Sequence, residues 1–488
     1  MIFISALLFL GIVLIHYYFN KNEILSKVYF PALSFKLFCG LLLYQLHLSF
    51  GILPDLFFYE QDIIRLSNYF WKDTLHYFIF LLTGKLNPSW VFIFATEGER
   101  AFFFVRYLSL MNVLASQNMY LTSIYGSLMA FFGLWACANR LADWFINQND
   151  SDSKIKKTKL ALSIGFFFLP SVAFWASSMM KEGFLWLIMG FLIAFFLDIL
   201  KFDYSKNPIK INNLEFIGIV IKTIFLLVLV LCLFLLKYYY FALLVPLLCA
   251  FGISFFATNY FTTHFTTFYT KSFRFQFFIF LGSFVLIVGL ASNLHPNLWF
   301  SRLSEAIFIN QQTILATSDP DSQLNFVYDY DFEPIYHNYK NGEHQNFPTF
   351  LHVFEQSPKA LVAGLFFPLE IDFSNFGNTD FNFYRFASVF ENWIILFFFI
   401  QTISIKKNFA QIRSLFLSKL SADPNSQKNN SKSNSKTNSL AILWLVGIIF
   451  CVGMATLLAL SAPNLGAIVR YKIGFLPFFI FGISMRLE

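Results

Sequence analysis

The feature that most constrains this chain is a series of long apolar runs. An α-helix needs about 20 consecutive apolar residues to cross the hydrocarbon core of a bilayer, and the sequence contains eleven runs of this kind. They cover residues 1–19, 33–53, 119–146, 160–178, 183–201, 215–236, 238–257, 276–292, 386–404, 440–462 and 465–485. Strands of a membrane β-barrel would alternate polar and apolar residues, and these runs do not. We therefore predict an all-α fold, a polytopic helical integral membrane protein.

The composition excludes other classes of protein. Only 13% of the residues are charged and 57% are hydrophobic, whereas about 25% of an average soluble protein is charged. This excludes a soluble globular enzyme, and a disordered chain would not carry so much apolar surface. The five cysteines lie inside apolar runs without metal-ligand spacing, so the sequence predicts neither disulfides nor a zinc site.

The basic residues set the predicted orientation. They lie between the apolar runs, so the net charge of +7 indicates topology and no nucleic-acid partner. Connections rich in Lys and Arg stay on the cytoplasmic side. Lys21 and Lys27 follow the first run, which places the N-terminus outside, and the alternation of eleven spans places the C-terminus in the cytoplasm. The first run has neither a basic n-region nor a cleavage site, so it is expected to remain as a helix.

This topology divides the chain into three parts. Residues 1–292 form a transmembrane part, 293–385 an extracytoplasmic loop region, and 386–488 the C-terminal helices with a disordered cytoplasmic linker at 421–439. The outer loop 54–118 is the ambiguous segment, because Lys85, Pro88 and Arg106 interrupt its apolar stretches. It forms either amphipathic helices on the membrane or one extra hairpin, which would give thirteen spans.

Few charged residues remain near the outer face, and Glu60 and Asp62 form the first group. Both follow an apolar run in an aromatic segment at the predicted membrane boundary. Partial desolvation raises the pKa of a carboxyl group, which suits a general base. The alternative is an ordinary acid that pairs with Arg65.

A second group comprises Ser177, Lys181 and Glu182, in a short outward hairpin. Ser177 and Lys181 are four residues apart, so we expect them on one helical face. An outward Lys runs against the positive-inside bias, which indicates a binding role. The alternative is a Lys that extends to the interface beside a neighbouring acid.

A third group is Arg470 with Lys472, near the outer end of the last run. Charges inside spans are costly and usually face a polar cavity or a partner. The fork of an Arg suits a phosphate or pyrophosphate, and Lys adds a point charge. An interfacial position for these cations is the alternative. Glu391, early in the run 386–404, adds another buried-charge candidate near this face.

The segment 293–385 combines carboxylates and aromatic rings, which suits sugars and equally suits a plain outer loop. Its run Asp329–Glu333 lacks EF-hand spacing, and its histidines show no ligand spacing. We therefore predict no cofactor and no metal residues, with a divalent metal left open.

The pattern resembles the multi-spanning, extracytoplasmic glycosyltransferases of the GT-C type and the bacterial envelope polysaccharide polymerases. The resemblance rests on Glu60 and Asp62, on the stretch from Pro170 to Glu182 and on Arg470-Tyr471-Lys472. A further stretch, from Ser357 through Glu370 to Glu391-Asn392, is similar to what such proteins carry after their large loop. In this chain Gln61 separates the two acids, which leaves open which of them is catalytic.

The resemblance implies an enzyme of the bacterial inner membrane. A carboxylate, Glu60 or Asp62, would activate the acceptor hydroxyl, and Arg470 with Lys181 would hold the phosphate of a polyprenyl-linked sugar. The partners expected are a lipid-linked sugar donor, a glycan or lipid acceptor and membrane lipids. Two other classes stay open: a flippase or transporter of lipid-linked oligosaccharides, and a non-catalytic membrane scaffold or secretion subunit.

Overall fold

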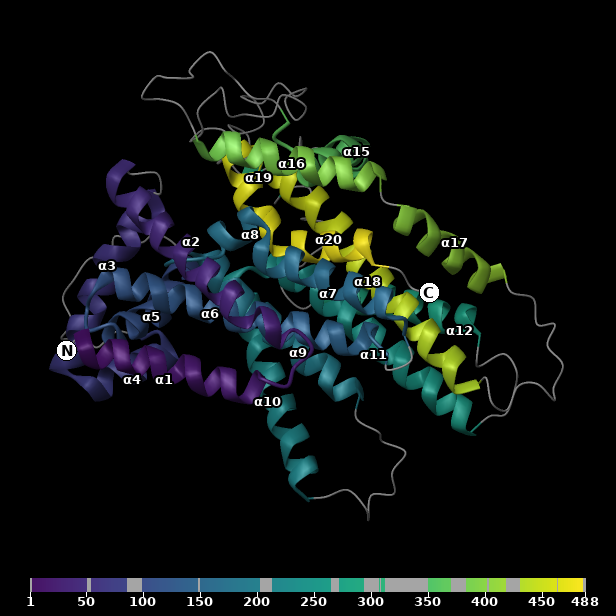
Figure 1. The fold of residues 1–488 in the computed structure, drawn as a ribbon, viewed down its shortest axis with the longest axis horizontal. Coiled ribbons are helices and arrows are strands. Elements are labelled where there is room, and N and C mark those ends of the chain that lie inside the picture. The colour runs from purple at the N-terminus through teal and green to yellow at the C-terminus, as the bar shows by residue number, and fades with distance from the viewer. Residues whose placement is uncertain are drawn as a thin grey trace. The chain divides into compact units, whose positions relative to one another are not determined.

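The computed structural model describes most of the chain, and its elements are helices (Figure 1). The described residues are 2–50, 54–85, 99–147, 150–201, 213–264, 272–293, 307, 309–311, 350–369, 383–401, 403–417, 431–462 and 464–485. Within these ranges the structure has no β-strand. The predicted all-α class is confirmed.

Eight helices are long and apolar enough to cross a membrane within the described ranges. They are α1 (Ile2–Asn20), α2 (Tyr29–Phe50), α6 (Met119–Phe145), α9 (Lys181–Lys201), α10 (Asn213–Leu236), α11 (Tyr238–His264), α12 (Phe273–Ala291) and α18 (Ser431–Ser461). Each contains most or all of one predicted apolar run. The polytopic helical membrane class follows from these helices, but the predicted total of eleven to thirteen is not reached in the described part of the chain.

Two predicted spans are interrupted helices. The run 160–178 is divided among α7 (Asp152–Ser163), a π-helical turn η2 (Ile164–Phe168) and α8 (Pro170–Trp175). Proline lacks a backbone N–H, and it starts the new helix α8. The run 465–485 comprises α19 (Leu465–Tyr471), a short 3₁₀ turn η10 (Lys472–Gly474) and α20 (Leu476–Ser484). Its two halves are bent by 63° and make a ninth span if counted together.

The predicted run 386–404 corresponds largely to α16 (Phe383–Gln401). The apolar part of this helix that is described in full covers residues 388–397 and is shorter than a span. A further helix, α17 (Ile403–Leu417), follows it.

The outer loop 54–118 contains three helices, α3 (Pro54–Lys72), α4 (Thr74–Thr83) and α5 (Glu99–Leu114). Helix α3 is amphipathic: Tyr59, Ile63 and Leu66 are buried, whereas Arg65 and Asn68 are exposed. Helix α5 packs against α3 and α6. Both α4 and α5 are shorter than a membrane span, which favours the amphipathic-helix alternative over the extra hairpin.

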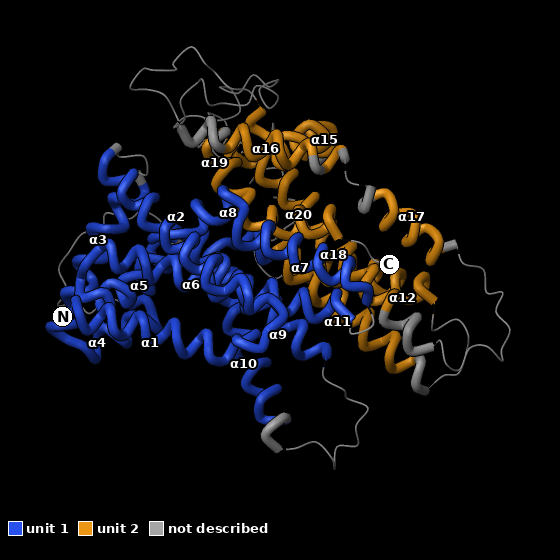
Figure 2. Tube along the Cα trace, viewed as in Figure 1, with its two compact units in different colours: residues 1–241 blue, residues 242–488 orange. Residues whose placement is uncertain are grey.

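The chain forms two compact units, residues 1–241 and 242–488 (Figure 2). In the first unit α6 and α9 pack closely because glycines face each other. A Cβ added at Gly190 would overlap the backbone of Gly133, and one added at Gly133 would overlap the backbone of Trp186. Small residues permit this close approach of two membrane helices.

An ion-pair network joins one set of helix ends in the first unit. The Arg140 guanidinium on α6 contacts Glu23 at 3.1 Å, Asp143 at 2.9 Å and Asp198 at 2.8 Å. Lys222 of α10 pairs with the same Asp198 at 2.5 Å. The C-terminal ends of α1, α6 and α9 and the N-terminal half of α10 therefore meet, in agreement with the predicted alternation of these helices. Which side of a membrane these ends face stays a prediction.

In the second unit, part of the predicted loop region 293–385 is helical. Helix α15 (Phe350–Phe366) packs along α18, where an added Cβ at Gly364 would overlap the backbone of Ala455. Ala360, Ala363 and Ala459 belong to the core that includes this contact region.

Helix α18 begins inside the segment 421–439, which we expected to be a disordered linker. Residues 431–439 are helical, and the Gln276 amide donates a hydrogen bond to Ser439 at 3.1 Å. Residues 421–430 lie outside the described part of the chain.

Candidate functional site

Glu60 is the better placed of the two predicted carboxylates. It lies half-buried on α3, and the hydroxyl of Tyr44 on α2 donates a hydrogen bond to it. Burial raises the pKa of the Glu60 carboxyl above its ordinary value of 4.5, and the Tyr44 hydrogen bond only partly offsets this. The carboxylate oxygen Oε1 is buried without a hydrogen-bond partner in the described residues. A carboxylate whose pKa is raised in this way is a stronger base than an ordinary Glu side chain.

Asp62 lies in a different environment. Its side chain is 0% exposed, and a carboxylate oxygen lies 3.6 Å from Nη1 of Arg65, one helical turn along α3. This is the ion pair that formed the alternative to a catalytic role. The geometry therefore favours Glu60 over Asp62 as a base.

The structure brings Lys181 next to this segment. Its Nζ atom lies 5.1 Å from the centre of the Tyr59 ring, directly before Glu60 in sequence. The ring of Tyr59 also meets the ring of Phe104 on α5 edge-on, with 5.6 Å between the ring centres. The electrostatic attraction between the ring and the ammonium group holds the cation at this position. Two of the predicted groups are thus adjacent in the first unit.

Ser177 does not share a helical face with Lys181, contrary to the prediction. Helix α8 ends at Trp175 and α9 begins at Lys181, and Ser178 between them has a φ of +59°. The Ser177 hydroxyl is fully buried and donates to the carbonyl of Ala173. The chain therefore turns sharply here, and the Ser177 hydroxyl stabilises the turn through its hydrogen bond to the end of α8.

The turn lies beside the helices α2 and α6, away from their ends. The amide of Ser178 donates to Oγ of Ser127 at 2.8 Å, and Ser123 donates to the Ser178 hydroxyl, also at 2.8 Å. Ser127 is eight residues into α6, which corresponds to about 12 Å along the helix axis. The expected outward hairpin is therefore placed alongside α6, well past the first turn of that helix.

Lys36 is a buried cation that the sequence analysis missed. It lies within α2 with its Nζ donating to the carbonyls of Val172 and Ala173 at 3.0 and 3.3 Å. These carbonyls belong to the last turns of α8, where they also accept hydrogen bonds from the Ala176 amide and the Ser177 hydroxyl, respectively. A single Lys within an apolar run was the available signal.

Glu182 pairs with Lys237, which the sequence analysis also missed. The distance from Nζ of Lys237 to Oε1 of Glu182 is 2.9 Å, and the two side chains are 7% and 1% exposed. Lys237 lies between two apolar runs on the same predicted outer side as Lys181. Its position against the positive-inside bias was the signal that could have identified it.

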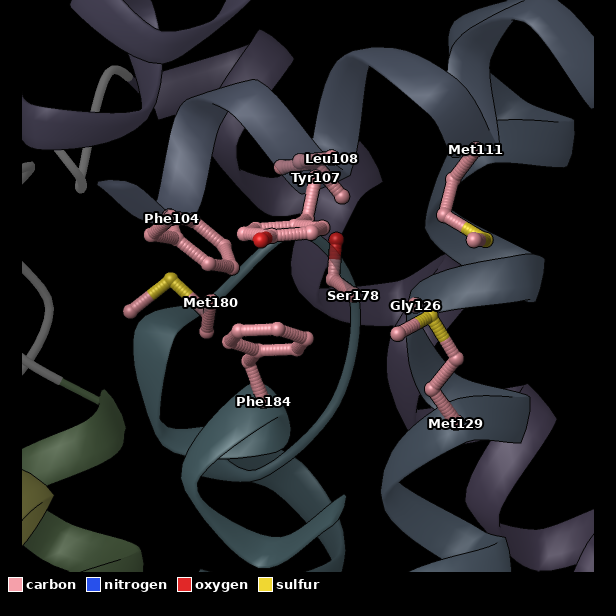
Figure 3. A pocket seen from close by; sticks show the side chains of 9 residues that line it. All are labelled: Phe104, Tyr107, Leu108, Met111, Gly126, Met129, Ser178, Met180 and Phe184. Carbon is pink, nitrogen blue, oxygen red and sulfur yellow. The ribbon is translucent and has the colours of Figure 1, made fainter. Parts of the chain in front are cut away.

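A narrow aromatic pocket lies in the first unit, between α5, α6 and the turn that precedes α9 (Figure 3). Phe184 of α9 stacks with Tyr107 of α5 at 5.9 Å, and Ser178 and Met180 of the turn contribute to the wall. The lining residues are Phe104, Tyr107, Leu108, Met111, Gly126, Met129, Ser178, Met180 and Phe184. Phe104 also contacts Tyr59, so the pocket adjoins the ring that holds Lys181.

The second unit contains the other predicted residues. Lys472, at the bend between α19 and α20, is 1% exposed and hydrogen-bonds Oδ1 of Asn392 on α16. The amide of Asn392 in turn donates to the carbonyl of Pro368 at 2.9 Å. Glu391, which is also buried, interacts electrostatically with Lys472. Lys472 and Glu391 are thus brought together, with Asn392 as an additional partner.

Arg470 precedes this cluster on α19 and is partly exposed. Its guanidinium carbon lies 5.1 Å from the centre of the ring of Tyr471, the next residue, and Nη2 donates to the hydroxyl of that ring at 3.4 Å. Unlike Lys472, Arg470 retains an accessible surface. It is the more exposed of the two cations.

The predicted site residues therefore form two groups, each described within its own unit. Glu60, Asp62, Ser177, Lys181 and Glu182 belong to residues 1–241, and Glu391, Arg470 and Lys472 belong to residues 242–488. The first group contains a carboxylate with a raised pKa, Glu60, and a cation, Lys181, that contacts the ring of the preceding residue Tyr59. The second contains a buried Lys at a helix break.

Within the described residues, no group of three or more His, Cys, Asp or Glu side chains is arranged to hold a metal ion. The run Asp329–Glu333 and His295, His337 and His344 lie outside the described residues. Comparison with protein-family models, with curated proteins and with solved structures gives no match to this chain.

Proposed function

We propose that this chain is a glycosyltransferase or glycan polymerase of the bacterial inner membrane. It would act on the extracytoplasmic face with a polyprenyl-phosphate-linked or polyprenyl-pyrophosphate-linked sugar as donor, in the assembly of an envelope or surface polysaccharide. The observation that carries the proposal is the placement of Lys181 on the ring of Tyr59, directly before Glu60.

In the proposed reaction, Glu60 accepts the proton of the acceptor hydroxyl. The acceptor oxygen attacks the anomeric carbon of the donor sugar, and the bond from that carbon to the phosphate oxygen breaks. The polyprenyl phosphate or pyrophosphate leaves with the bonding electron pair. A cation near the leaving group stabilises its developing negative charge, which is the role proposed for Lys181.

The raised pKa of Glu60 supports this role because a general base works best when its pKa lies close to the working pH. Arg470 is the proposed phosphate ligand of the second unit, because this residue is partly exposed and a guanidinium can bind two phosphate oxygens. Lys472 is not proposed as a direct ligand, since Asn392 already accepts a hydrogen bond from its ammonium group.

The experiment uses a strain whose surface glycan depends on this chain. Glu60→Gln, Lys181→Ala and Arg470→Ala should each abolish or strongly reduce glycan output at unchanged protein level in the membrane. Asp55→Asn and Lys72→Gln, at the two ends of the same helix as Glu60, serve as controls and should leave output unchanged. Unchanged output in the Glu60 and Lys181 variants would refute the proposed site, and in Arg470→Ala it would refute that assignment.

The bent last span favours a second candidate, a flippase or transporter of lipid-linked oligosaccharides. Broken helices with charged groups at the break are typical of transporter binding sites, and Lys472 lies at a break of 63°. The two functions differ in their chemistry. Purified protein with donor and acceptor forms a new glycosidic bond only if it is a transferase, whereas a transporter moves the intact lipid-linked glycan between leaflets.

A further inference from the structure

Arg106 is a buried cation that the proposed function does not use. It lies on α5 with a side chain that is 8% exposed. Its guanidinium carbon lies 5.4 Å from the centre of the Phe103 ring and 5.9 Å from the centres of the Phe80 and Tyr107 rings. Aromatic rings thus surround the charge and remove water from it.

The hydrogen bonds of Arg106 are mostly unused. A guanidinium carries five N–H donors, and the structure gives it one hydrogen bond, from Nη1 to the carbonyl of Phe80 at 3.3 Å. The Nε atom is buried and has no hydrogen-bond partner in the described ranges. Among the described residues no carboxylate forms a salt bridge with it. A buried donor that stays unsatisfied is costly, and more so when it is charged.

The end of α4 lies against Arg106, and a second basic residue follows it in sequence. Gly84 caps this helix with a φ of +72°, and an added Cβ there would overlap Nη1 of Arg106. Lys85 follows directly and is exposed, also without a salt bridge in the described part of the chain. The carbonyl end of α4 accounts for one hydrogen bond of Arg106, but among the described residues it leaves the buried Nε donor without an acceptor.

The same helix presents an apolar face to its surroundings. Leu75 and Leu82 of α4 are 70% and 81% exposed, and Phe78 and Ile79 are exposed as well. In a membrane protein such a face is covered by acyl chains, so the two cations lie at the end of a lipid-facing helix.

We propose that Arg106, with Lys85, binds the phosphate group of a membrane lipid. A phosphate supplies the oxygen acceptors that are missing around the guanidinium. It can accept two parallel N–H hydrogen bonds from Arg106, while Lys85 contributes a point charge. The acyl chains of the same lipid would lie along the exposed face of α4. This inference is independent of the proposed glycosyl transfer, because it uses neither Glu60 nor Lys181.

The test measures lipid binding by the purified full-length protein in detergent. Three probes are compared: phosphatidylglycerol, diacylglycerol, which lacks the phosphate, and inorganic phosphate, which lacks the acyl chains. We expect phosphatidylglycerol to raise the melting temperature and to remain bound in native mass spectrometry, and the other two to have little effect. If diacylglycerol stabilises the protein as much as phosphatidylglycerol does, the phosphate group is not what Arg106 binds. If inorganic phosphate stabilises it equally, the site binds a free phosphate and not a lipid.

Substitutions at Arg106 and Lys85 test which residues bind the lipid phosphate. Arg106→Gln should weaken phosphatidylglycerol binding roughly tenfold to a hundredfold, the loss expected for charge-assisted hydrogen bonds, and Lys72→Gln should leave it unchanged. If Arg106→Gln fails to fold, Arg106→Lys and Lys85→Gln replace it, and each should weaken binding by a smaller factor. Wild-type lipid binding in folded variants of both positions would refute the proposal.

Discussion

The Nζ atom of Lys181 lies 5.1 Å from the centre of the Tyr59 ring. This contact joins the first residue of α9 to the amphipathic helix α3, two segments that are far apart in sequence. Because Glu60 follows Tyr59 directly, the contact brings a cation to the helical turn that carries the candidate base.

Replacement of Lys181 tests whether its positive charge is needed for sugar transfer. We expect Lys181→Ala to reduce sugar transfer by roughly 10²-fold or more, the loss typical of one preorganised electrostatic group in an active site. Lys181→Arg should retain part of the activity because it preserves the charge. Lys201→Ala removes a cation from the other end of the same helix and should have little effect. Equal activities of Lys181→Ala and Lys201→Ala would contradict the assigned role.

The pH dependence of stability tests the environment of Glu60. Its folded-state pKa lies above the unfolded value because of burial, so folding favours the protonated carboxyl. The stabilisation is present at pH below the unfolded value and is lost as the pH rises through the folded value. Glu60→Gln should therefore be more stable than the wild type at neutral pH and nearly equal to it at acidic pH. Melting temperatures across this pH range measure the difference.

Tyr44→Phe provides the control for this interpretation. The Tyr44 hydrogen bond lowers the pKa of Glu60, so its removal should raise that pKa further. The rise of transfer rate with pH should then move to higher pH. A Tyr44→Phe profile that moves to lower pH would show that the rate reports a different group.

The buried ion pair between Glu182 and Lys237 should contribute strongly to stability. Removal of one partner leaves a buried charge uncompensated, at a cost of about 3–5 kcal/mol. We expect Glu182→Ala and Lys237→Ala each to lower the melting temperature sharply, and the double variant to lose much less than the sum. The wild type, the two single variants and the double variant are denatured in detergent as a double-mutant cycle. Additive losses of stability would show that the two side chains do not interact.

Close packing between α6 and α9 predicts an effect of a single methyl group. Gly190→Ala should destabilise the protein by about 1–3 kcal/mol because the added group overlaps the backbone of Gly133. Gly218→Ala on α10 is the matched control, since no atom lies within 4 Å of the added Cβ. It should be neutral or stabilising by up to about 1 kcal/mol. A loss of similar size in both variants would point to a general intolerance of alanine.

Apolar run length predicted most of the membrane helices because a bilayer requires one local property, a stretch of sufficient hydrophobicity. It failed at 160–178, where the composition is apolar throughout and Pro170 nevertheless starts a separate helix. Run length also could not reveal the 63° bend near Lys472, because the length of an apolar run does not indicate where its helix breaks.

The candidate site was predicted in part. Glu60 and Lys181 were identified by their positions outside the cytoplasmic connections, but their proximity depends on tertiary packing through Tyr59. Lys36 was overlooked because one Lys does not interrupt an apolar run, and its role depends on carbonyls of a helix far along the chain. The different environments of Glu60 and Asp62 arise from which face of α3 is buried, a property that the two-residue spacing alone does not assign.

Glycosidic bond formation by the purified Glu60→Gln protein tests the central claim most directly. The protein is supplied with a polyprenyl-linked sugar donor and a glycan acceptor, and the elongated product and donor binding are measured beside the wild type. We predict that donor binding persists while product formation falls by roughly 10²- to 10⁴-fold, the range for loss of a general base. Product formation at the wild-type rate would contradict the account.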